Sequence, residues 1–457
     1  MSSVVSTFKE KSAVKAADLK HRKTINYNIG KYNAVVPVGK RQFSDLEFAR
    51  KKAKNTKWKA LETLDIQLEK FEKNLLAMGG KVIWAVDTAQ ACEAILKICR
   101  DRNCKSLVKS KSMVTEEIHL NDFLQQNGIE SVETDLGEYI QQLDNEPPYH
   151  IVTPAMHKSK EDVARVFHEH LQTPLDLTPE QLTLVAREKL RKKYREAEVG
   201  VTGANFIIAD TGGIAVTENE GNARLSASWP KTHIVVVGLE KVIPSIHDLA
   251  LFWPLLSTFG TGQQVTVYNS IINGPKQSTE SDGPEEMYVI LLDNGRTQVL
   301  QDPVSRESLY CIRCGACLNA CPVYKNIGGH AYGTTYSGPI GSVITPNLKE
   351  LGEWNHLSHA SSLCGNCTEV CAVKINLHEL LLHNRHETVT SGKGSAMESI
   401  AWKAWQTGML HRKMMNMGNH RIKNWMVNKL FKGWTGHRAD LKFPAKSFNQ
   451  QWREMIS

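Results

Sequence analysis

The sequence lacks the apolar segments that place a protein in a membrane or send it through one. Among its 457 residues, no window approaches the roughly 18 consecutive apolar residues of a membrane span. Residues 1–11 lack the apolar core, about 7 to 15 residues long, of a secretory signal. We therefore expect a cytoplasmic protein.

Nucleotide-binding fingerprints are also missing. No G-x-G-x-x-G motif follows a predicted strand, and the sequence contains no G-x-x-x-x-G-K-[ST] motif. The sequence therefore predicts neither a dinucleotide site nor a P-loop. Hydride removal from an organic substrate needs a flavin or nicotinamide centre, so we do not expect this chain to perform it alone.

Predicted helices and strands alternate over residues 60–295. The composition, 41% apolar and 23% charged, is that of a globular protein, and the length predicts two or three domains. Apolar residues recur with helical spacing over 60–78. Strands are predicted at 81–86, 106–109, 129–134, 150–153, 204–210, 214–217, 232–238, 265–269 and 287–292. This alternation is typical of an α/β domain with a largely parallel sheet.

Seven of the ten cysteines lie in two short runs. The run 311–321 follows the pattern C-x2-C-x2-C-x3-C and is followed by Pro322, whereas the run 364–371 repeats the same spacings with one cysteine fewer. In this pattern three thiolates hold one iron–sulfur cluster and the fourth reaches another. A zinc site is the alternative, but zinc sites usually separate cysteine pairs by about 15 to 20 residues. The spacing therefore predicts two iron–sulfur clusters, and the one with four thiolates is expected to be of the [4Fe-4S] type.

Crossed ligation assigns each thiol to a cluster. The first cluster takes Cys311, Cys314, Cys317 and Cys371, and the second takes Cys321, Cys364 and Cys367. The missing fourth ligand aligns with Ser361, and Ala372 replaces the proline of the first run. The open corner could take the Ser361 hydroxyl, water or no iron at all. Oxygen suits this bonding less well than sulfur, so we expect the second cluster to be labile or of the [3Fe-4S] type. The alternative is that Ser361 caps a helix beginning near Leu363.

Other features have simpler interpretations. Cys92, Cys99 and Cys104 lie in or just after a predicted helix, and we interpret them as packing residues. The polar loops 218–222 and 258–262 could line an anion or substrate pocket, or their glycines could only permit positive φ. The glycine- and tyrosine-rich segment 325–341 is long enough to cover a cluster, dock a partner or donate N–H bonds to sulfur.

The C-terminal tail is basic and aromatic. Residues 402–457 hold eleven Lys and Arg against two acidic residues, a net charge of about +9. Interleaved with them are Trp402, Trp405, Trp425, Phe431, Trp434 and Trp452. Such a tail can contact the inner membrane surface or an acidic electron acceptor, or it can be a solvated face over an aromatic core. No nucleic-acid-binding module accompanies the charge, so nucleic acid is not an expected partner.

Four segments, 109–113, 132–140, 203–213 and 311–317, together resemble the lactate utilisation protein B family. The resemblance implies an α/β LUD domain at 61–300, similar to CoA-transferases and sugar isomerases, followed by a mainly α-helical two-cluster ferredoxin-type domain at 301–392. From their composition, we expect residues 1–60 to form a basic helical arm and residues 393–457 a basic helical tail. The family's ligands carry over to Cys311, Cys314, Cys317, Cys321, Cys364, Cys367 and Cys371. No catalytic motif carries over, so the catalytic residues are unknown.

The resemblance also implies a function. The chain is expected to be the iron–sulfur electron-transfer subunit of a system that oxidises L-lactate to pyruvate. Its expected partners are an iron–sulfur subunit and a second LUD-domain subunit. The alternative is an oxidoreductase whose LUD domain acts on a small hydroxy acid and uses the clusters as an electron outlet. Because dinucleotide motifs are absent, we expect a companion to carry some or all of the substrate oxidation.

Overall fold

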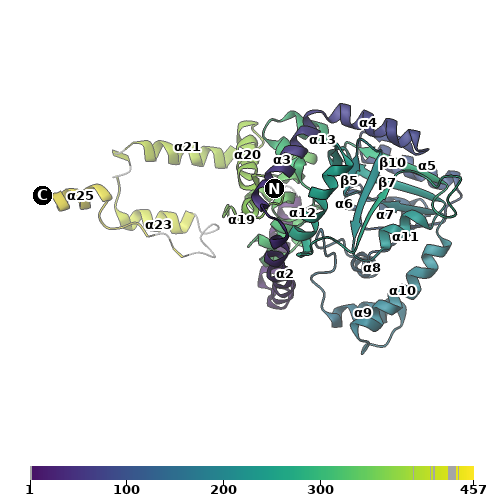
Figure 1. Cartoon of the computed structure of the whole chain (residues 1–457). Helices are drawn as coiled ribbons and strands as arrows, with labels where there is room; N and C mark the ends of the chain where they lie inside the picture. Colours follow the sequence, from purple (N-terminus) through teal and green to yellow (C-terminus); the bar gives the residue numbers. More distant parts are fainter. Residues whose placement is uncertain are drawn as a thin grey trace. The chain divides into compact units, whose positions relative to one another are not determined.

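The computed structural model describes residues 3–394, 396–411, 413–414, 417–430, 439–440 and 442–456. The chain forms two compact units, Met1–Thr388 and Val389–Ser457, and each is described by itself (Figure 1). None of the helices in the described ranges is long and apolar enough to cross a membrane.

A six-stranded parallel sheet is the centre of the first unit. Its strand order is β1-β10-β7-β4-β2-β3, and every neighbouring pair is parallel. The strands are β1 (Lys81–Ala85), β2 (Ser106–Lys109), β3 (Glu130–Glu133), β4 (Val199–Thr202), β7 (Thr232–Gly238) and β10 (Glu286–Leu292). Parallel sheets need cover on both faces, and every residue of β7 is buried. The predicted α/β architecture with a parallel sheet is therefore confirmed.

Helices and a smaller sheet cover the two faces of the large sheet. In β7, Ile234 and Val236 join a core with helices α5 (Thr88–Asp101) and α7 (Leu120–Gln126). The alternate residues Val235 and Val237 join a second core with α4 (Leu64–Ala77). Because successive side chains of a strand point to opposite faces, β7 contributes apolar residues to the cores on both faces of the sheet. The other helices of this part are α6 (Met113–Glu117), α8 (Leu136–Leu143), α9 (Lys160–Leu171), α10 (Pro179–Glu196) and α11 (Asn222–Ser228).

The smaller sheet has the strand order β8-β5-β6-β9. Its strands are β5 (Phe206–Ile208), β6 (Gly213–Glu218), β8 (Val242–Ile243) and β9 (Tyr268–Ile272). The predicted reversal between β5 and β6 is confirmed, because these strands pair antiparallel. Gly212 has a φ of +70°, and a Cβ there would lie 2.3 Å from the backbone nitrogen of Leu75. This turn therefore requires glycine where it packs on α4.

Two strand predictions need correction. The predicted strand at 265–269 lies instead at Tyr268–Ile272. The strand predicted at 150–153 is wrong, because these residues form bends and coil. The reason is local: Nδ1 of His150 accepts the N–H groups of Val152 (3.1 Å) and Thr153 (3.3 Å), which turns the chain back on itself.

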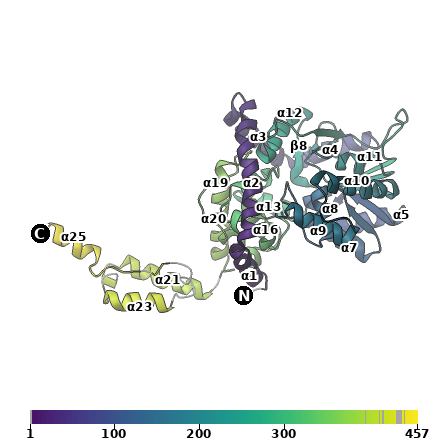
Figure 2. The same cartoon turned by 90° about the horizontal axis from the view of Figure 1, so that it is seen from below.

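The cysteine-bearing part packs against the α/β part and against the N-terminal helices. Helix α2 (Leu19–Gly39) contacts both α12 (Leu249–Thr261) and α15 (Tyr324–Ile327) (Figure 2). One apolar core runs through all three regions. The remaining helices of this unit are α1 (Ser3–Ala17), α3 (Leu46–Glu62), α13 (Arg296–Gln301), α14 (Ala316–Ala320), α16 (Gly338–Leu348), α17 (Leu351–Trp354), α18 (His356–His359), α19 (Asn366–Glu369) and α20 (Leu377–Thr390).

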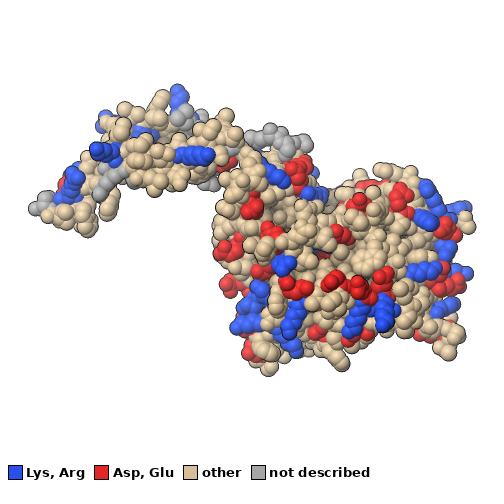
Figure 3. All heavy atoms as spheres, turned by 90° about the horizontal axis from the view of Figure 1, so that it is seen from above, with Lys and Arg blue, Asp and Glu red and all other residues tan. Residues whose placement is uncertain are grey.

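The C-terminal unit consists of helices where it is described. They are α21 (Ala396–Leu410), α23 (His420–Leu430) and α25 (Phe448–Ile456). Trp402, Trp405, Trp425 and Trp452 are exposed, whereas Phe431 and Trp434 lie outside the described residues. On the face drawn in Figure 3, basic side chains of this unit outnumber acidic ones. The described tryptophans therefore do not form a buried aromatic core within the unit.

Candidate functional site

The first cysteine run forms a tight loop that leads into α14. Cys311 follows the 3-10 helix Ser305–Tyr310, and Cys317 lies within α14. Arg313 and Gly315 adopt positive φ values of 62° and 78°. These two left-handed residues curl the backbone so that the N–H of Arg313 donates to Sγ of Cys311 at 3.4 Å.

The second run repeats this local geometry. Leu363 and Gly365 have positive φ values of 52° and 77°, at the positions that correspond to Arg313 and Gly315. The N–H of Leu363 donates to Oγ of Ser361 at 3.1 Å. Ser361 therefore occupies the local position that Cys311 occupies in the first run.

Ser361 does not cap a helix, so that alternative is wrong. The next helix, α19, begins at Asn366, and its N-cap is Gly365, without a side-chain capping bond. The second run meets the first where α19 packs on α14 and where Nδ2 of Asn366 donates to the carbonyl of Ala320 at 3.1 Å.

The first group of thiols contains Cys311, Cys314 and Cys317 of the first run and Cys371 of the second run. Burial, together with the neighbouring thiols of Cys371 and Cys311, raises the pKa of Cys314 to about 12. Burial also raises the pKa of Cys317, with added effects of Cys311, Cys314 and Cys371. These four residues line a single small cavity. Three sulfurs of the first run and one of the second are therefore neighbours.

The other thiols form a second group. Burial and then the thiol of Cys321 raise the pKa of Cys367 to about 11, and Cys364 adds to this effect. The pKa of Cys321 is raised by burial and by Cys364. Cys364 itself is exposed, so this group lies nearer to solvent than the first.

Both groups of thiols are suited to bind metal ions. Neighbouring buried thiols resist ionisation on their own, and metal ions make the thiolate form stable. Backbone N–H groups also point at the sulfurs: Tyr324 donates to Cys321 (3.4 Å) and Ile375 to Cys371 (3.3 Å). The backbone N–H groups of Ala372 and Ile340 bond Cys314 and Cys317 and act to lower their pKa values. Ala372 can donate because it is not proline.

A pocket of about 370 Å³ adjoins the first thiol group. It lies where the carboxyl ends of β2, β4 and β7 face the first cysteine loop, which is the edge of a parallel sheet where ligands commonly bind. Residues that line it include Lys111, Asn205, Thr217, Lys241, Arg313 and Cys314.

Both glycine-bearing loops singled out from the sequence reach this pocket. Residues 218–220 and 222 line it, as do Gly260 and Thr261. Gly221 and Gly262 have positive φ, which confirms that these glycines permit left-handed turns. The role of the pocket as an anion or substrate site stays a prediction. The segment 258–261 is the end of α12 and not a loop.

A buried charge network includes Tyr336, which also lines the pocket. Arg296 donates to Glu240 (2.6 Å) and to Glu117 (2.8 and 3.0 Å), and the Tyr336 hydroxyl donates to Glu117 (2.6 Å). Although burial opposes ionisation, Arg296 and Lys241 hold the pKa of Glu240 low, at about 2. Sequence patterns gave no indication of this network, because its members come from distant elements.

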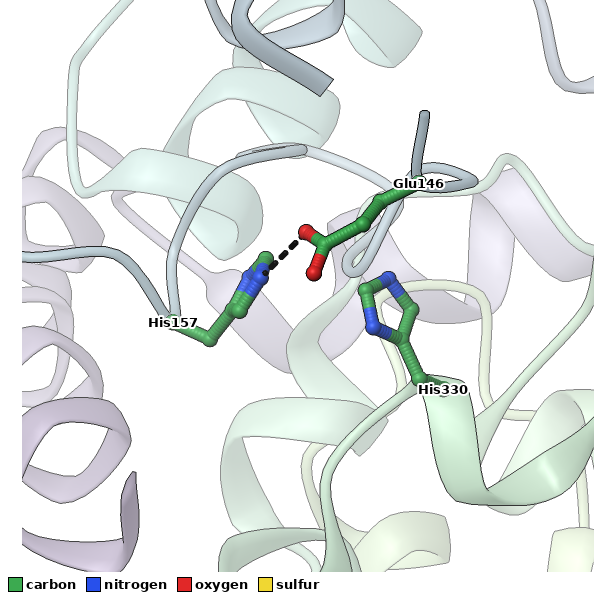
Figure 4. A group of neighbouring side chains, drawn as sticks. All are labelled: Glu146, His157 and His330. Carbon is green, nitrogen blue, oxygen red and sulfur yellow. Dashed lines mark hydrogen bonds and ion pairs between the residues drawn. The ribbon is translucent and has the colours of Figure 1, made fainter. Parts of the chain in front are cut away.

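A cluster of histidines joins the α/β part to the cysteine-bearing part. Figure 4 shows Glu146, His157 and His330 with their side chains converging. His157 bonds Glu146 at 3.0 Å and stacks on Tyr149 at 4.4 Å between ring centroids. His330 bonds the Pro147 carbonyl at 2.7 Å.

These contacts fill a structural role. The Glu146, His157 and His330 side chains could reach one metal ion. However, the Lys158 ammonium lies 2.9 Å from Glu146 and neutralises its charge. We therefore interpret the group as a clasp between the two parts, and we call it the histidine clasp.

Cys92, Cys99 and Cys104 are buried in the core between α5 and the sheet. Helix α20 begins directly after Asn376, and its residues Leu377, Leu380 and Leu381 are buried.

Comparisons with known proteins agree with this architecture. A family model described as the LUD domain matches residues 68–292, and one described as the 4Fe-4S dicluster domain matches residues 307–375. The chain thus joins an α/β LUD domain to a dicluster iron–sulfur domain, and iron–sulfur clusters are its cofactors.

Relatives define the family. The chain is 44% identical to "Lactate utilization protein B" of Bacillus velezensis over 416 residues, covering 88% of this chain and 87% of that protein. It is 44% identical to the protein of the same name from Bacillus subtilis, covering 86% and 84%, and 45% identical to that from Geobacillus thermodenitrificans, covering 78% and 75%. The chain belongs to the lactate utilization protein B family, which confirms the resemblance.

A crystal structure of a DUF162 family protein from Deinococcus radiodurans is also similar, at 14% identity. It covers 50% of this chain and 98% of that protein, with a TM-score of 0.29. A similarity this weak carries no argument about the fold.

The histidine clasp predicts a loss of stability in acid. Burial, and then the charge of His157, lowers the pKa of His330 to about 4. A histidine whose pKa is lower in the folded state stabilises the fold above its unfolded pKa of about 6.5 and loses this contribution as the pH falls. Replacing His330 with glutamine should therefore remove about 1 kcal/mol of the pH dependence of unfolding between pH 7.5 and 5.5. Denaturant unfolding at each pH measures this.

His170→Gln is the matched control, because this histidine is exposed on α9. It should leave the pH dependence unchanged. Identical pH profiles for wild type and His330→Gln would contradict a neutral, half-buried histidine in the clasp.

Proposed function

We propose that this chain is the iron–sulfur electron-transfer component of a system that oxidises L-lactate to pyruvate. The printed name of its relatives and the two groups of thiols support this role. Its companions are an iron–sulfur subunit and a second LUD-domain subunit. The lack of a dinucleotide fingerprint supports placing hydride removal on a companion.

The proposed ligands follow the two thiol groups. Cys311, Cys314, Cys317 and Cys371 hold one [4Fe-4S] cluster, and Cys321, Cys364 and Cys367 hold the second. Ser361 is the proposed fourth ligand of the second cluster. The observation that supports it is the shared geometry of the two runs, in which Oγ of Ser361 and Sγ of Cys311 accept equivalent N–H groups.

A second candidate function is supported by the pocket. Because Cys314 belongs to both the pocket wall and the first thiol group, a small hydroxy acid in the pocket would lie beside a cluster. In this alternative the LUD domain itself acts on the acid, and the clusters are its electron outlet. We also propose that the α/β part has a fold similar to that of CoA-transferases and sugar isomerases.

The tail is the proposed contact with the inner membrane surface or an electron acceptor in the cytoplasm. Its described helices expose Trp402, Trp405, Phe448 and Trp452 beside basic residues. Exposed aromatic residues next to Lys and Arg are typical of segments that bind anionic surfaces. The proposed domain limits, at residues 60, 300 and 392, likewise stay predictions.

The main test is whether L-lactate can reduce the clusters of this chain in the absence of the companion proteins. With the companion proteins present under anaerobic conditions, L-lactate should bleach the visible absorption of the clusters, whereas D-lactate should have no effect. Without the companions neither isomer should act, because the chain has no predicted site for hydride acceptance. Bleaching of the isolated chain by L-lactate would instead support the second candidate function.

The serine ligand predicts a specific change in cluster stability. Wild-type protein oxidised in air should give the electron spin resonance signal of a three-iron cluster, because oxygen holds the fourth iron less firmly than sulfur does. Ser361→Cys should abolish that signal by completing the set of thiols. Ser362→Cys, at the exposed neighbouring position, is the matched control and should retain it. If wild type never gives the signal and keeps its full iron content, the predicted lability is wrong.

A further inference from the structure

The pocket beside the first thiol group contains two buried cationic side chains. Lys241 is 5% exposed, and the side chain of Arg313 is 11% exposed. Both line the pocket. Buried charges are costly unless other groups compensate them, so the partners of these two side chains are informative.

Arg313 is only partly compensated. Its guanidinium stacks over the Tyr336 ring at 4.5 Å, and its Nη2 lies 3.6 Å from Oε1 of Glu240. Its Nη1 atom is buried and has no hydrogen-bond partner among the described residues. A guanidinium normally engages anions through a planar pair of N–H donors, so this arrangement leaves donor capacity unused.

Lys241 is also weakly partnered. The one hydrogen bond found for its ammonium in the described part of the chain goes to the Cys311 carbonyl at 3.5 Å. Oε2 of the nearby Glu240 carboxylate accepts from Arg296 at 2.6 Å, whereas its buried Oε1 has no hydrogen-bond partner among the described residues. A third pocket cation, Lys111, donates to the Val152 carbonyl at 2.7 Å and is therefore engaged.

The acidic residues of the pocket are engaged as well. Glu218 accepts the N–H groups of Ala223 (2.7 Å) and Arg224 (2.9 Å). Glu220 accepts that of Leu136 (3.1 Å), and Asp135 that of Glu138 (3.1 Å). These carboxylates therefore have partners of their own, and Arg313 and Lys241 are left with capacity for an anion from outside the chain.

We propose that this pocket binds a small carboxylate, of the 2-hydroxy or 2-oxo acid class, whose carboxylate group is held by Arg313 and Lys241. The volume of about 370 Å³ suits a small ligand. A planar guanidinium matches a carboxylate or a phosphate. The sequence lacks a glycine-rich phosphate loop, which favours the carboxylate. This inference deepens the proposed function and rests on it for the identity of the acid.

The position of the site has a consequence for the first thiol group. The bound anion lies beside Cys314, so it repels an electron added to the metal centre that this group holds. The anion therefore binds more weakly to the reduced protein than to the oxidised protein. By linkage, binding lowers the midpoint potential of that centre, and a tenfold difference in affinity corresponds to about 59 mV for one electron.

Isothermal titration calorimetry on the full chain, prepared anaerobically with its clusters, tests the site. The probes are L-lactate, pyruvate and inorganic phosphate. Lactate or pyruvate should bind with one site per chain, and phosphate should bind at least tenfold more weakly. Lys241→Met and Arg313→Met should each weaken carboxylate binding at least tenfold. Lys231→Met is the matched control, because this lysine is 80% exposed at the surface, and it should bind like wild type.

A second readout separates binding from damage to the clusters. Iron and sulfide content are measured for each variant, because Arg313 lies inside the first cysteine loop. Lys241 lies outside both cysteine runs, so Lys241→Met decides the question if Arg313→Met loses iron. A potentiometric titration should show a lower midpoint for one centre with pyruvate present, and this shift should disappear in Lys241→Met.

Three outcomes would overturn the inference. They are no binding heat from either acid at full iron content, unchanged binding in Lys241→Met, and phosphate binding as tight as that of the acids. In each case the proposed function stands if L-lactate still reduces the clusters through the companions. Conversely, acid binding without such reduction would leave the site in place and remove the electron-transfer role.

Discussion

The structure depends on the burial of cysteine thiols that belong to different segments of the chain. A buried thiol resists losing its proton, and several thiols close together resist it more strongly, as the raised pKa of Cys314 shows. Metal ions reverse this preference, because a thiolate is stable beside them. The same residues are part of the apolar core that joins the cysteine-bearing part to α2 and α12. Cluster binding and folding of this part are therefore linked.

The N-terminal helices contribute to the same region. Arg50 of α3 donates to the carbonyl of Cys371 at 2.8 and 3.1 Å and to that of Glu369 at 2.7 Å. These bonds fix the backbone of the second run, which supplies the crossing thiol of the first group. Residues 1–60, which the sequence predicts to be a basic helical arm, thus stabilise the backbone beside the proposed cluster ligands.

The two parts of the first unit meet at charges as well as at apolar residues. Glu240 follows β7 at the carboxyl edge of the sheet and lies between Arg296 and Arg313. Arg313 in turn belongs to the first cysteine loop. A change of charge in the pocket therefore changes the electrostatic potential at the first thiol group, because the path between them is short and buried and little water screens it. This geometry is a physical basis for the proposed coupling of ligand binding to the proposed electron transfer.

Sequence reasoning succeeded where a pattern is local. Alternation of strands and helices predicted the parallel sheet, which is confirmed. The cysteine spacing predicted crossed ligation; Cys311, Cys314, Cys317 and Cys371 line one cavity, and their role as ligands stays a prediction. Sequence reasoning failed where contacts decide the outcome. The strand expected at 150–153 is replaced by bends, because the His150 side chain bonds the backbone that a strand would use. The short strand β4 went unrecognised because Val199–Thr202 directly follows a long charged helix.

The buried ion pairs show a further limit. Lys109 is fully buried between Glu116 (2.8 Å) and Glu133 (2.7 Å), and Arg296 between Glu117 and Glu240. Each pair joins residues from different elements, so no spacing rule identifies it. For Lys109, the sequence offers one indication: a lysine at the end of an apolar strand is expected to have a buried acidic partner, but the sequence does not identify that partner.

The crossed arrangement of the cysteines is tested most directly by iron and sulfide analysis of anaerobically prepared protein. Wild type should hold more iron and sulfide than one four-iron cluster requires. Cys371→Ser should lose much of that iron, because this thiol joins the first group. Cys104→Ser should retain all of it, since Cys104 is buried in the core beside α5, outside both cysteine runs, and donates to the Ser106 carbonyl (3.4 Å). Stoichiometric zinc without visible absorption, or an unchanged iron content in Cys371→Ser, would contradict the account.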